Sequence, residues 1–186
     1  MDSTAILRKM ADNRSTDKLY ADYTINHQRE IQVMNALCTE YVGRGVPMPS
    51  YEDINPDEQN GISFTGGIRV KPDMFFYVND KTFTYEIKFN NHDRFHEFDG
   101  VESVFIKCGA IITMCKDTKA YPNGHAIISD SRKFAILTAQ AVDTYPIEPI
   151  DFYGGKKCFV IPVENLNWLP WMTPIPPVKY RGWQRV

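Results

Sequence analysis

Three residues whose side chains could support metal-dependent hydrolysis lie close together in the sequence: Asp73, Glu86 and Lys88. Carboxylates are the ligands that Mg²⁺ prefers in proteins. A lysine beside a bound cation can orient a water, lower its pKa or stabilise charge on a phosphate. The three side chains therefore predict a centre for phosphate-ester chemistry, provided that the fold brings them together.

Two strand-like segments carry these residues, 71–78 and 81–89, with Asn79 and Asp80 between them. Asn and Asp tolerate the left-handed backbone conformation that a tight hairpin requires. A two-residue turn places Val78 opposite Lys81 and Asp73 opposite Glu86. A four-residue turn would shift the register by two residues and keep the same residues on each face.

Alternation along the hairpin divides its side chains between two faces. One face receives Asp73, Glu86 and Lys88. The other face is wholly apolar or aromatic, as a core face should be, and holds Met74, Phe76, Val78, Phe83, Tyr85 and Ile87. Two carboxylates that face each other destabilise a strand pair unless something compensates them. A divalent cation would do so, with the backbone carbonyl of Ile87 as a third protein ligand; the alternative is an exposed hairpin without a site.

An amphipathic helix is predicted over residues 24–42, ending at Gly43. Its apolar stripe contains Met34, Leu37, Cys38 and Tyr41, and Glu30 and His27 fall in the same stripe. A carboxylate on a core-facing side should be paired, neutral or bound to metal. If the helix packs on the hairpin, Glu30 reaches the carboxylates; otherwise it extends to water or pairs with Lys88. His27 is either a further ligand or a capping or solvated histidine.

The remaining pattern predicts one mixed α/β (α+β) domain over residues 1–169 and a Pro- and Trp-rich basic tail over 170–186. The expected elements are helices at 3–12 and 93–108, strands at 110–115 and 157–163, and loops at 43–61 and 143–157. The segment 125–142 is compatible with strand or helix.

Composition excludes several classes of protein. The net charge of −2 argues against a protein that coats nucleic acid through a global positive field. No apolar segment is long enough for a membrane span, and the first residues lack a secretory signal, so we expect a cytoplasmic protein with no membrane partner. The four cysteines form no C-x-x-C pair, which favours reduced thiols over a zinc site.

The motif Pro72-Asp73 followed by Glu86-Ile87-Lys88 resembles the signature of the PD-(D/E)xK nuclease superfamily. The resemblance covers about residues 24–163. It implies a restriction-endonuclease-like core, with a central mixed β-sheet flanked by helices. It also implies that Asp73 and Glu86 bind Mg²⁺ or Mn²⁺, that Lys88 activates water and that Glu30 supports the metal site.

Among small members, the organisation is similar to Holliday-junction resolvases and phage-type endonucleases, which implies a homodimer that cuts DNA, in the host cytoplasm if a phage encodes it. The chain lacks the glutamine-bearing motif of the resolvases; His92, His96 and Glu97 occupy that region. Two alternatives remain. The first is a nuclease of another specificity, either an RNA endonuclease or an exonuclease that acts on ends. The arrangement of His27 beside Glu30 resembles that of viral cap-snatching endonucleases, which favours an RNA endonuclease. A nuclease-like module that only binds nucleic acid or protein is the other.

Local basic and aromatic side chains are the expected nucleic-acid contacts, since the chain as a whole is slightly acidic. The candidates are Arg69, Lys71, Arg94, Lys107, Lys179, Arg181, Trp183 and Arg185. The alternative for the tail is that Trp168, Trp171 and Trp183 dock on the domain or on a partner subunit.

Overall fold

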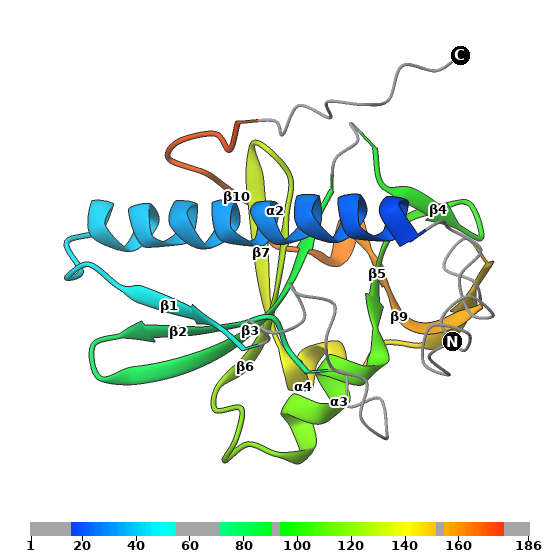
Figure 1. Cartoon of the computed structure of the whole chain (residues 1–186). Coiled ribbons are helices and arrows are strands. Elements are labelled where there is room, and N and C mark those ends of the chain that lie inside the picture. Colours follow the sequence, from blue (N-terminus) through cyan, green and yellow to red (C-terminus); the bar gives the residue numbers. More distant parts are fainter. Residues whose placement is uncertain (1–15, 55–70, 91–93, 152–154, 177–186) are drawn as a thin grey trace.

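A computed structural model describes residues 16–54, 71–90, 94–151 and 155–176, with side chains from Ile25 onward. The predicted helix at 3–12 lies outside these residues. Two sheets and a long helix organise the fold (Figure 1). The predicted α+β class with a central mixed sheet is confirmed. Of the helices in the described part of the chain, none has the length and apolar content that crossing a membrane requires.

The central sheet, sheet A, has the strand order β1-β2-β3-β6-β7-β10. Its strands are β1 (Ser50–Asp53), β2 (Met74–Val78), β3 (Lys81–Phe89), β6 (Gly124–Ser129), β7 (Lys133–Thr138) and β10 (Leu169–Pro170). β3 and β6 are parallel and the other neighbours are antiparallel, so the sheet is mixed. β1 corrects our prediction of an unbroken loop over 43–61.

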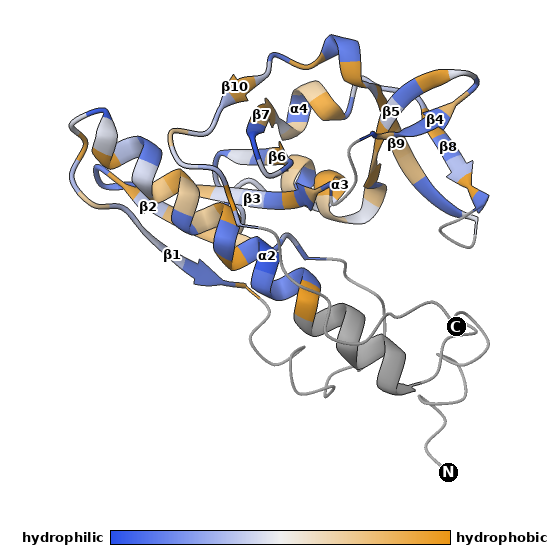
Figure 2. Cartoon of the chain, turned by 90° about the horizontal axis from the view of Figure 1, so that it is seen from above, coloured by the Kyte–Doolittle hydropathy of each residue, from blue (hydrophilic) through white to orange (hydrophobic). Residues whose placement is uncertain are grey.

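A second sheet, sheet B, has the order β4-β5-β9-β8 and is antiparallel throughout. Its strands are β4 (His96–Phe98), β5 (Val101–Lys107), β8 (Ile147–Ile150) and β9 (Lys156–Pro162). β9 confirms the strand predicted at 157–163, whereas β8 lies in a segment predicted as loop. Figures 1 and 2 place sheet B at the end of the molecule opposite the β2–β3 turn.

The largest correction concerns residues 93–116, where we predicted a helix followed by a strand. The structure has the reverse: the β4–β5 hairpin comes first, and α3 (Cys108–Lys116) follows it. Asp99 and Gly100 both have positive φ angles, 51° and 79°, as a tight hairpin turn requires. The segment 125–142, predicted as strand or helix, contains β6, β7 and the short helix α4 (Ala139–Val142).

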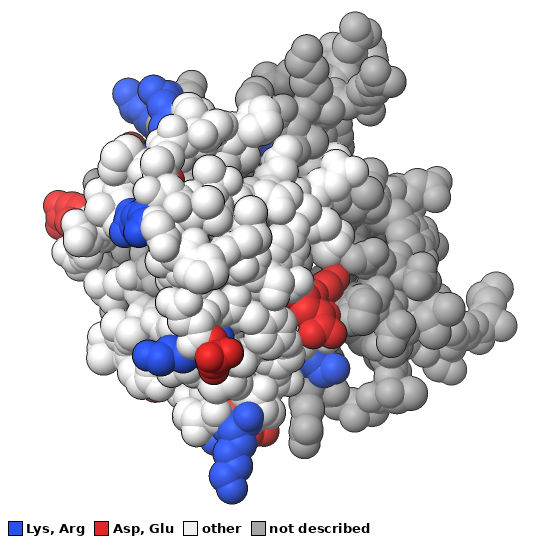
Figure 3. All heavy atoms as spheres, turned by 90° about the vertical axis from the view of Figure 1, so that its left-hand side faces the viewer, with Lys and Arg blue, Asp and Glu red and all other residues white. Residues whose placement is uncertain are grey.

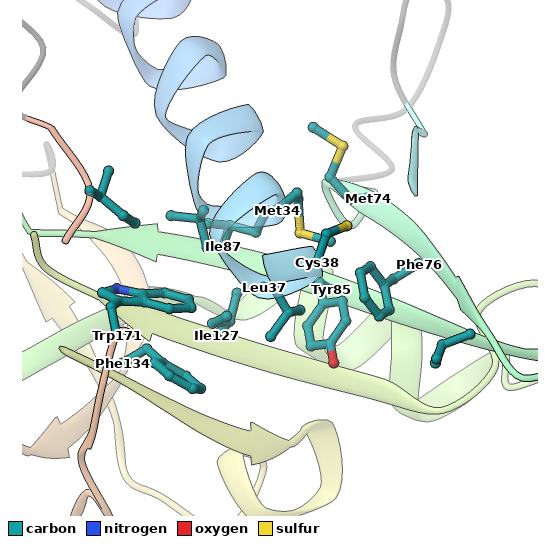
Figure 4. Packing of buried hydrophobic residues seen from close by; sticks show 13 residues of the cluster. Met34, Leu37, Cys38, Met74, Phe76, Tyr85, Ile87, Ile127, Phe134 and Trp171 are labelled. Carbon is teal, nitrogen blue, oxygen red and sulfur yellow. The ribbon is translucent and has the colours of Figure 1, made fainter. Parts of the chain in front are cut away.

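Helix α2 (Thr16–Gly43) confirms the predicted helix and begins earlier than expected. It lies across one face of sheet A and buries Val33, Met34 and Leu37 against that sheet (Figure 4). Each such side chain contributes roughly 1.5–3 kcal/mol on burial. This packing fixes the position of α2 on sheet A, and therefore the position of Glu30 relative to the hairpin.

The segment after β10 belongs to the same core. The ring of Trp171 stacks on Phe134 with 4.0 Å between centroids, and its Nε1 donates to Ser129 Oγ at 3.0 Å. Trp168 donates from Nε1 to the carbonyl of Val163, in the short 3₁₀ helix η3 (Val163–Asn165), at 3.2 Å. Docking on the domain therefore holds for Trp168 and Trp171.

Candidate active site

The β2–β3 hairpin has the predicted two-residue turn. Asn79 and Asp80 adopt φ angles of 48° and 61°, and Val78 pairs with Lys81. This register brings Asp73, directly before β2, to the Glu86–Lys88 segment of β3. The predicted core face is also confirmed, since alternate residues of β2 are buried against α2.

Asp73 is fixed to the middle of the Glu-x-Lys segment by two hydrogen bonds. Its backbone N–H donates to the Tyr85 carbonyl at 2.9 Å, and its Oδ2 accepts from the Ile87 N–H at 2.6 Å. The N–H and C=O of one strand residue point to the same side of the strand. The Ile87 carbonyl is therefore directed towards the Asp73 side of β3. Pro72 has no N–H with which to continue the β2–β3 ladder.

Glu86 lies beside Asp73 and is only 6% exposed. Its pKa is raised to about 8 by burial and, next, by the charge of Asp73. Burial also raises the pKa of Asp73, while the hydrogen bond from Ile87 lowers it. The two carboxylates thus oppose each other's ionisation, and a cation between them would relieve that cost.

Glu30 joins this pair from α2, as we predicted from the helical stripe. Its pKa is raised to about 9, first by burial and then by the charges of Asp73 and Glu86. His27 lies one turn earlier, with its Nδ1 3.5 Å from Glu30 Oε2 and 3.7 Å from Asp53 Oδ2. The histidine therefore bridges α2 and β1.

Asp53 is a fourth acidic residue, which we did not predict. It ends β1 opposite Met74, and the N–H of Ile54 donates to the Asp73 carbonyl at 3.0 Å. Its charge raises the pKa of both Glu30 and Asp73. An acidic residue at the end of the short run 50–53 was the available signal, but the prolines and glycines around that run indicated loop.

Two lysines balance part of this negative charge. Lys88 lowers the pKa of Asp73, Glu86 and Glu30. Lys107, at the end of β5, also lowers the pKa of Asp73 and Glu86. We had assigned Lys107 to nucleic-acid contacts, and the structure brings it next to the carboxylates.

The other predicted contacts are spread out. Lys71 is exposed directly before Pro72, and Arg94 is exposed near the end of β3, where its carbonyl accepts from Asn90 Nδ2. Arg69 and the four tail residues, Lys179, Arg181, Trp183 and Arg185, lie outside the described residues. Among the described residues, Figure 3 shows scattered charges of both signs on the face that includes the hairpin tip.

The donor set fits a hard divalent cation held by few protein ligands. Within the described residues, no group of three or more His, Cys, Asp and Glu side chains forms a ready-made metal cage. Mg²⁺ ordinarily keeps several waters and binds through one or two carboxylates. Asp73, Glu86 and the Ile87 carbonyl provide that smaller set. All four cysteines are free thiols, which hard cations such as Mg²⁺ do not prefer as ligands.

Comparison with solved structures finds similarity of fold. No family model matches the chain, and no curated protein matches it. A solved structure of Hjc from Archaeoglobus fulgidus, a Holliday junction resolvase, is similar with a TM-score of 0.41 and 10% sequence identity. The match covers 70% of this chain and 86% of that one. A similarity of this size assigns no function, which rests on the residues of the site.

The carboxylates predict an unusual dependence of stability on pH. The folded-state pKa values of Asp73, Glu86 and Glu30 are raised to about 6, 8 and 9. Below the ordinary carboxylate pKa, their contribution to stability is fully present; it is lost as the pH rises through the raised values. Without metal, the melting temperature should therefore fall between about pH 4, near the ordinary carboxylate pKa, and about pH 9.

Saturating Mn²⁺ should reduce this fall, because a bound cation favours the ionised carboxylates. Differential scanning fluorimetry over this pH range, in EDTA and in Mn²⁺, measures both effects. A melting temperature that rises with pH in EDTA would contradict the assigned repulsion.

Proposed function

We propose that this chain is a metal-dependent endodeoxyribonuclease of the PD-(D/E)xK superfamily, which hydrolyses phosphodiester bonds in DNA. The observation that carries the proposal is the hydrogen bond from the Ile87 N–H to the Asp73 carboxylate, because Ile87 is the residue between Glu86 and Lys88 in the motif. The motif resemblance and the raised carboxylate pKa values support the same site.

Each residue has a definite role in the proposed reaction. Asp73, Glu86 and the Ile87 carbonyl would hold Mg²⁺ or Mn²⁺, with Glu30 supporting the site from α2. The bound cation would lower the pKa of water and offset charge on the phosphate oxygens. Lys88 would orient the attacking water and stabilise the negative charge that develops on the phosphate. Burial of Glu86 strengthens these electrostatic interactions because the local dielectric constant is low.

The proposed partners are DNA and a second copy of the chain in the cytoplasm. A homodimer would present two sites to two strands, which suits branched DNA such as a four-way junction. RNA is the second candidate substrate, favoured by His27 lying 3.5 Å from Glu30 and 3.7 Å from Asp53. A histidine among carboxylates adds a nitrogen ligand, which Mn²⁺ accepts more readily than Mg²⁺ does.

A substrate panel tests the proposal. The purified chain is incubated with plasmid, linear duplex, single-stranded DNA, a four-way junction and RNA, each in EDTA, Mg²⁺ or Mn²⁺. Cleavage that requires metal supports a nuclease, and the preferred substrate separates the DNA and RNA candidates. A folded protein that binds nucleic acid and cuts none of these substrates would favour the binding-only alternative.

A further inference from the structure

Lys107 and Lys156 of sheet B lie on one face, and Lys107 lies next to the carboxylates. Lys107 of β5 pairs directly with Cys158 of β9. Lys156 precedes Cys158 by two residues on β9, so its side chain projects on the same face as Cys158 and Lys107. Diagonal neighbours of this kind lie about 7–8 Å apart across a strand pair.

These lysines and Lys88 form a cationic cluster. Lys107 is half-buried, and its pKa is lowered first by burial and then by the charges of Lys88 and Lys156. The charge of Glu86 raises the pKa of Lys107. Glu86 does not neutralise Lys107 alone, because its carboxylate also interacts with Asp73 and Lys88. Repulsion among three cations is relieved when an anion binds beside them, as repulsion among the carboxylates is relieved by a cation.

The far end of the same face has the opposite character. An apolar groove there, lined in part by Phe98, Tyr145 and Val160, is bordered by acidic residues. Asp99 and Glu164 lie at the end away from the lysines, whereas Glu148 pairs with Cys158 and so lies near Lys107 and Lys156. A polyanion is therefore attracted to Lys107 and Lys156 and repelled from the part of the groove that holds Asp99 and Glu164.

We propose that Lys107 and Lys156 bind the phosphate backbone of the nucleic-acid strand whose scissile phosphate lies at Asp73 and Glu86. This inference rests on the proposed function and adds sheet B to the binding surface. A nucleic-acid strand is the partner that fits, because its backbone carries a phosphate at every nucleotide. Neighbouring lysines on one face can therefore contact successive phosphates. Since the chain has a net charge of −2, such local cations must supply the attraction.

We call the phosphate-binding surface formed by Lys107 and Lys156 the track. Fluorescence anisotropy tests it without hydrolysis, with a labelled DNA duplex and a labelled single strand, in EDTA and over a series of salt concentrations. Lys156→Gln should weaken binding roughly three- to tenfold and lower the salt slope by about one. Lys157→Gln is the matched control, because Lys157 is the next residue of β9, exposed, and projects from the opposite face. Its affinity should stay within about twofold of the wild type.

Lys107→Gln should weaken binding at least as much, and Lys107→Arg should restore it; circular dichroism checks that each variant folds. Equal losses in Lys156→Gln and Lys157→Gln, or no loss in Lys156→Gln, would overturn the track. Metal-dependent cleavage unaffected in KM by Lys156→Gln would remove this inference and leave the proposed function. Lys156-dependent binding without cleavage in any metal would support the track and remove the proposed function.

Discussion

Asp73→Asn is expected to reduce metal-dependent cleavage by about 10³-fold, the size of effect seen when an enzyme loses one preorganised electrostatic contact to the reacting groups. The asparagine Oδ1 can still accept the hydrogen bond from the Ile87 N–H, which Asp73 accepts at 2.6 Å. The fold of the hairpin should therefore survive. The variant removes one negative charge, and with it the affinity for a divalent cation.

Initial rates on the preferred substrate in Mn²⁺ measure the loss, and a Mn²⁺ titration of the melting temperature measures binding separately. The wild type should gain stability with Mn²⁺, and Asp73→Asn should gain little. Asp80→Asn is the matched control, because it makes the same chemical change at the exposed turn of the same hairpin, where asparagine tolerates φ = 61°. Cleavage by Asp73→Asn within about tenfold of the wild type would place the metal elsewhere.

The geometry of this hairpin could be predicted because local chemistry determines it. Asn79 and Asp80 favour a two-residue turn, the turn sets the register, and the register sets which side chains share a face. The position of Glu30 was predictable for a similar reason: helical periodicity places it in the stripe that α2 buries on sheet A. Neither inference needed any information on distant parts of the chain.

The reversal at 93–116 has a physical cause. β5 is covered on both faces, so Val104, Phe105 and Ile106 are all buried and the strand lacks the alternation of a half-buried strand. Short apolar runs of this kind do not separate strand from helix by periodicity. The turn residues Asp99 and Gly100 were the better signal, since Asp-Gly is a strong hairpin sequence.

Asp53 and Lys107 enter the site through topology. Asp53 reaches it because β1 pairs with β2 across a long connection, and Lys107 because β5 belongs to a sheet that packs beside sheet A. No pattern near either residue identifies its neighbours. The sequence therefore predicts the residues that one hairpin and one helix bring together, while contributions from separate strands depend on long-range pairing.

Glu86→Gln is expected to lower cleavage by about 10²–10³-fold and, in EDTA, to raise the melting temperature by about 2–4 °C, which corresponds to roughly 1 kcal/mol in a chain of this size. Both effects follow from one cause. Burial and Asp73 oppose the ionisation of Glu86, so a neutral isostere removes a cost in the metal-free protein. The same substitution removes a metal ligand, so saturating Mn²⁺ should stabilise the variant less than the wild type.

Glu97→Gln is the matched control for this exchange, since Glu97 is exposed on β4. It pairs with Glu102, so the exchange should leave cleavage unchanged and raise the melting temperature less than Glu86→Gln does. The decrease in melting temperature between about pH 4 and pH 9 should also become shallower in Glu86→Gln, because one of the groups with a raised pKa is gone. A variant that loses stability in EDTA, with the pH profile unchanged, would mean that Lys88 and Lys107 already compensate the Glu86 carboxylate. The site would then be a self-sufficient ion-pair network with no need of a cation. An increase in stability in EDTA, a loss of cleavage and a smaller stabilisation by Mn²⁺ are together the outcome that a metal-binding role predicts.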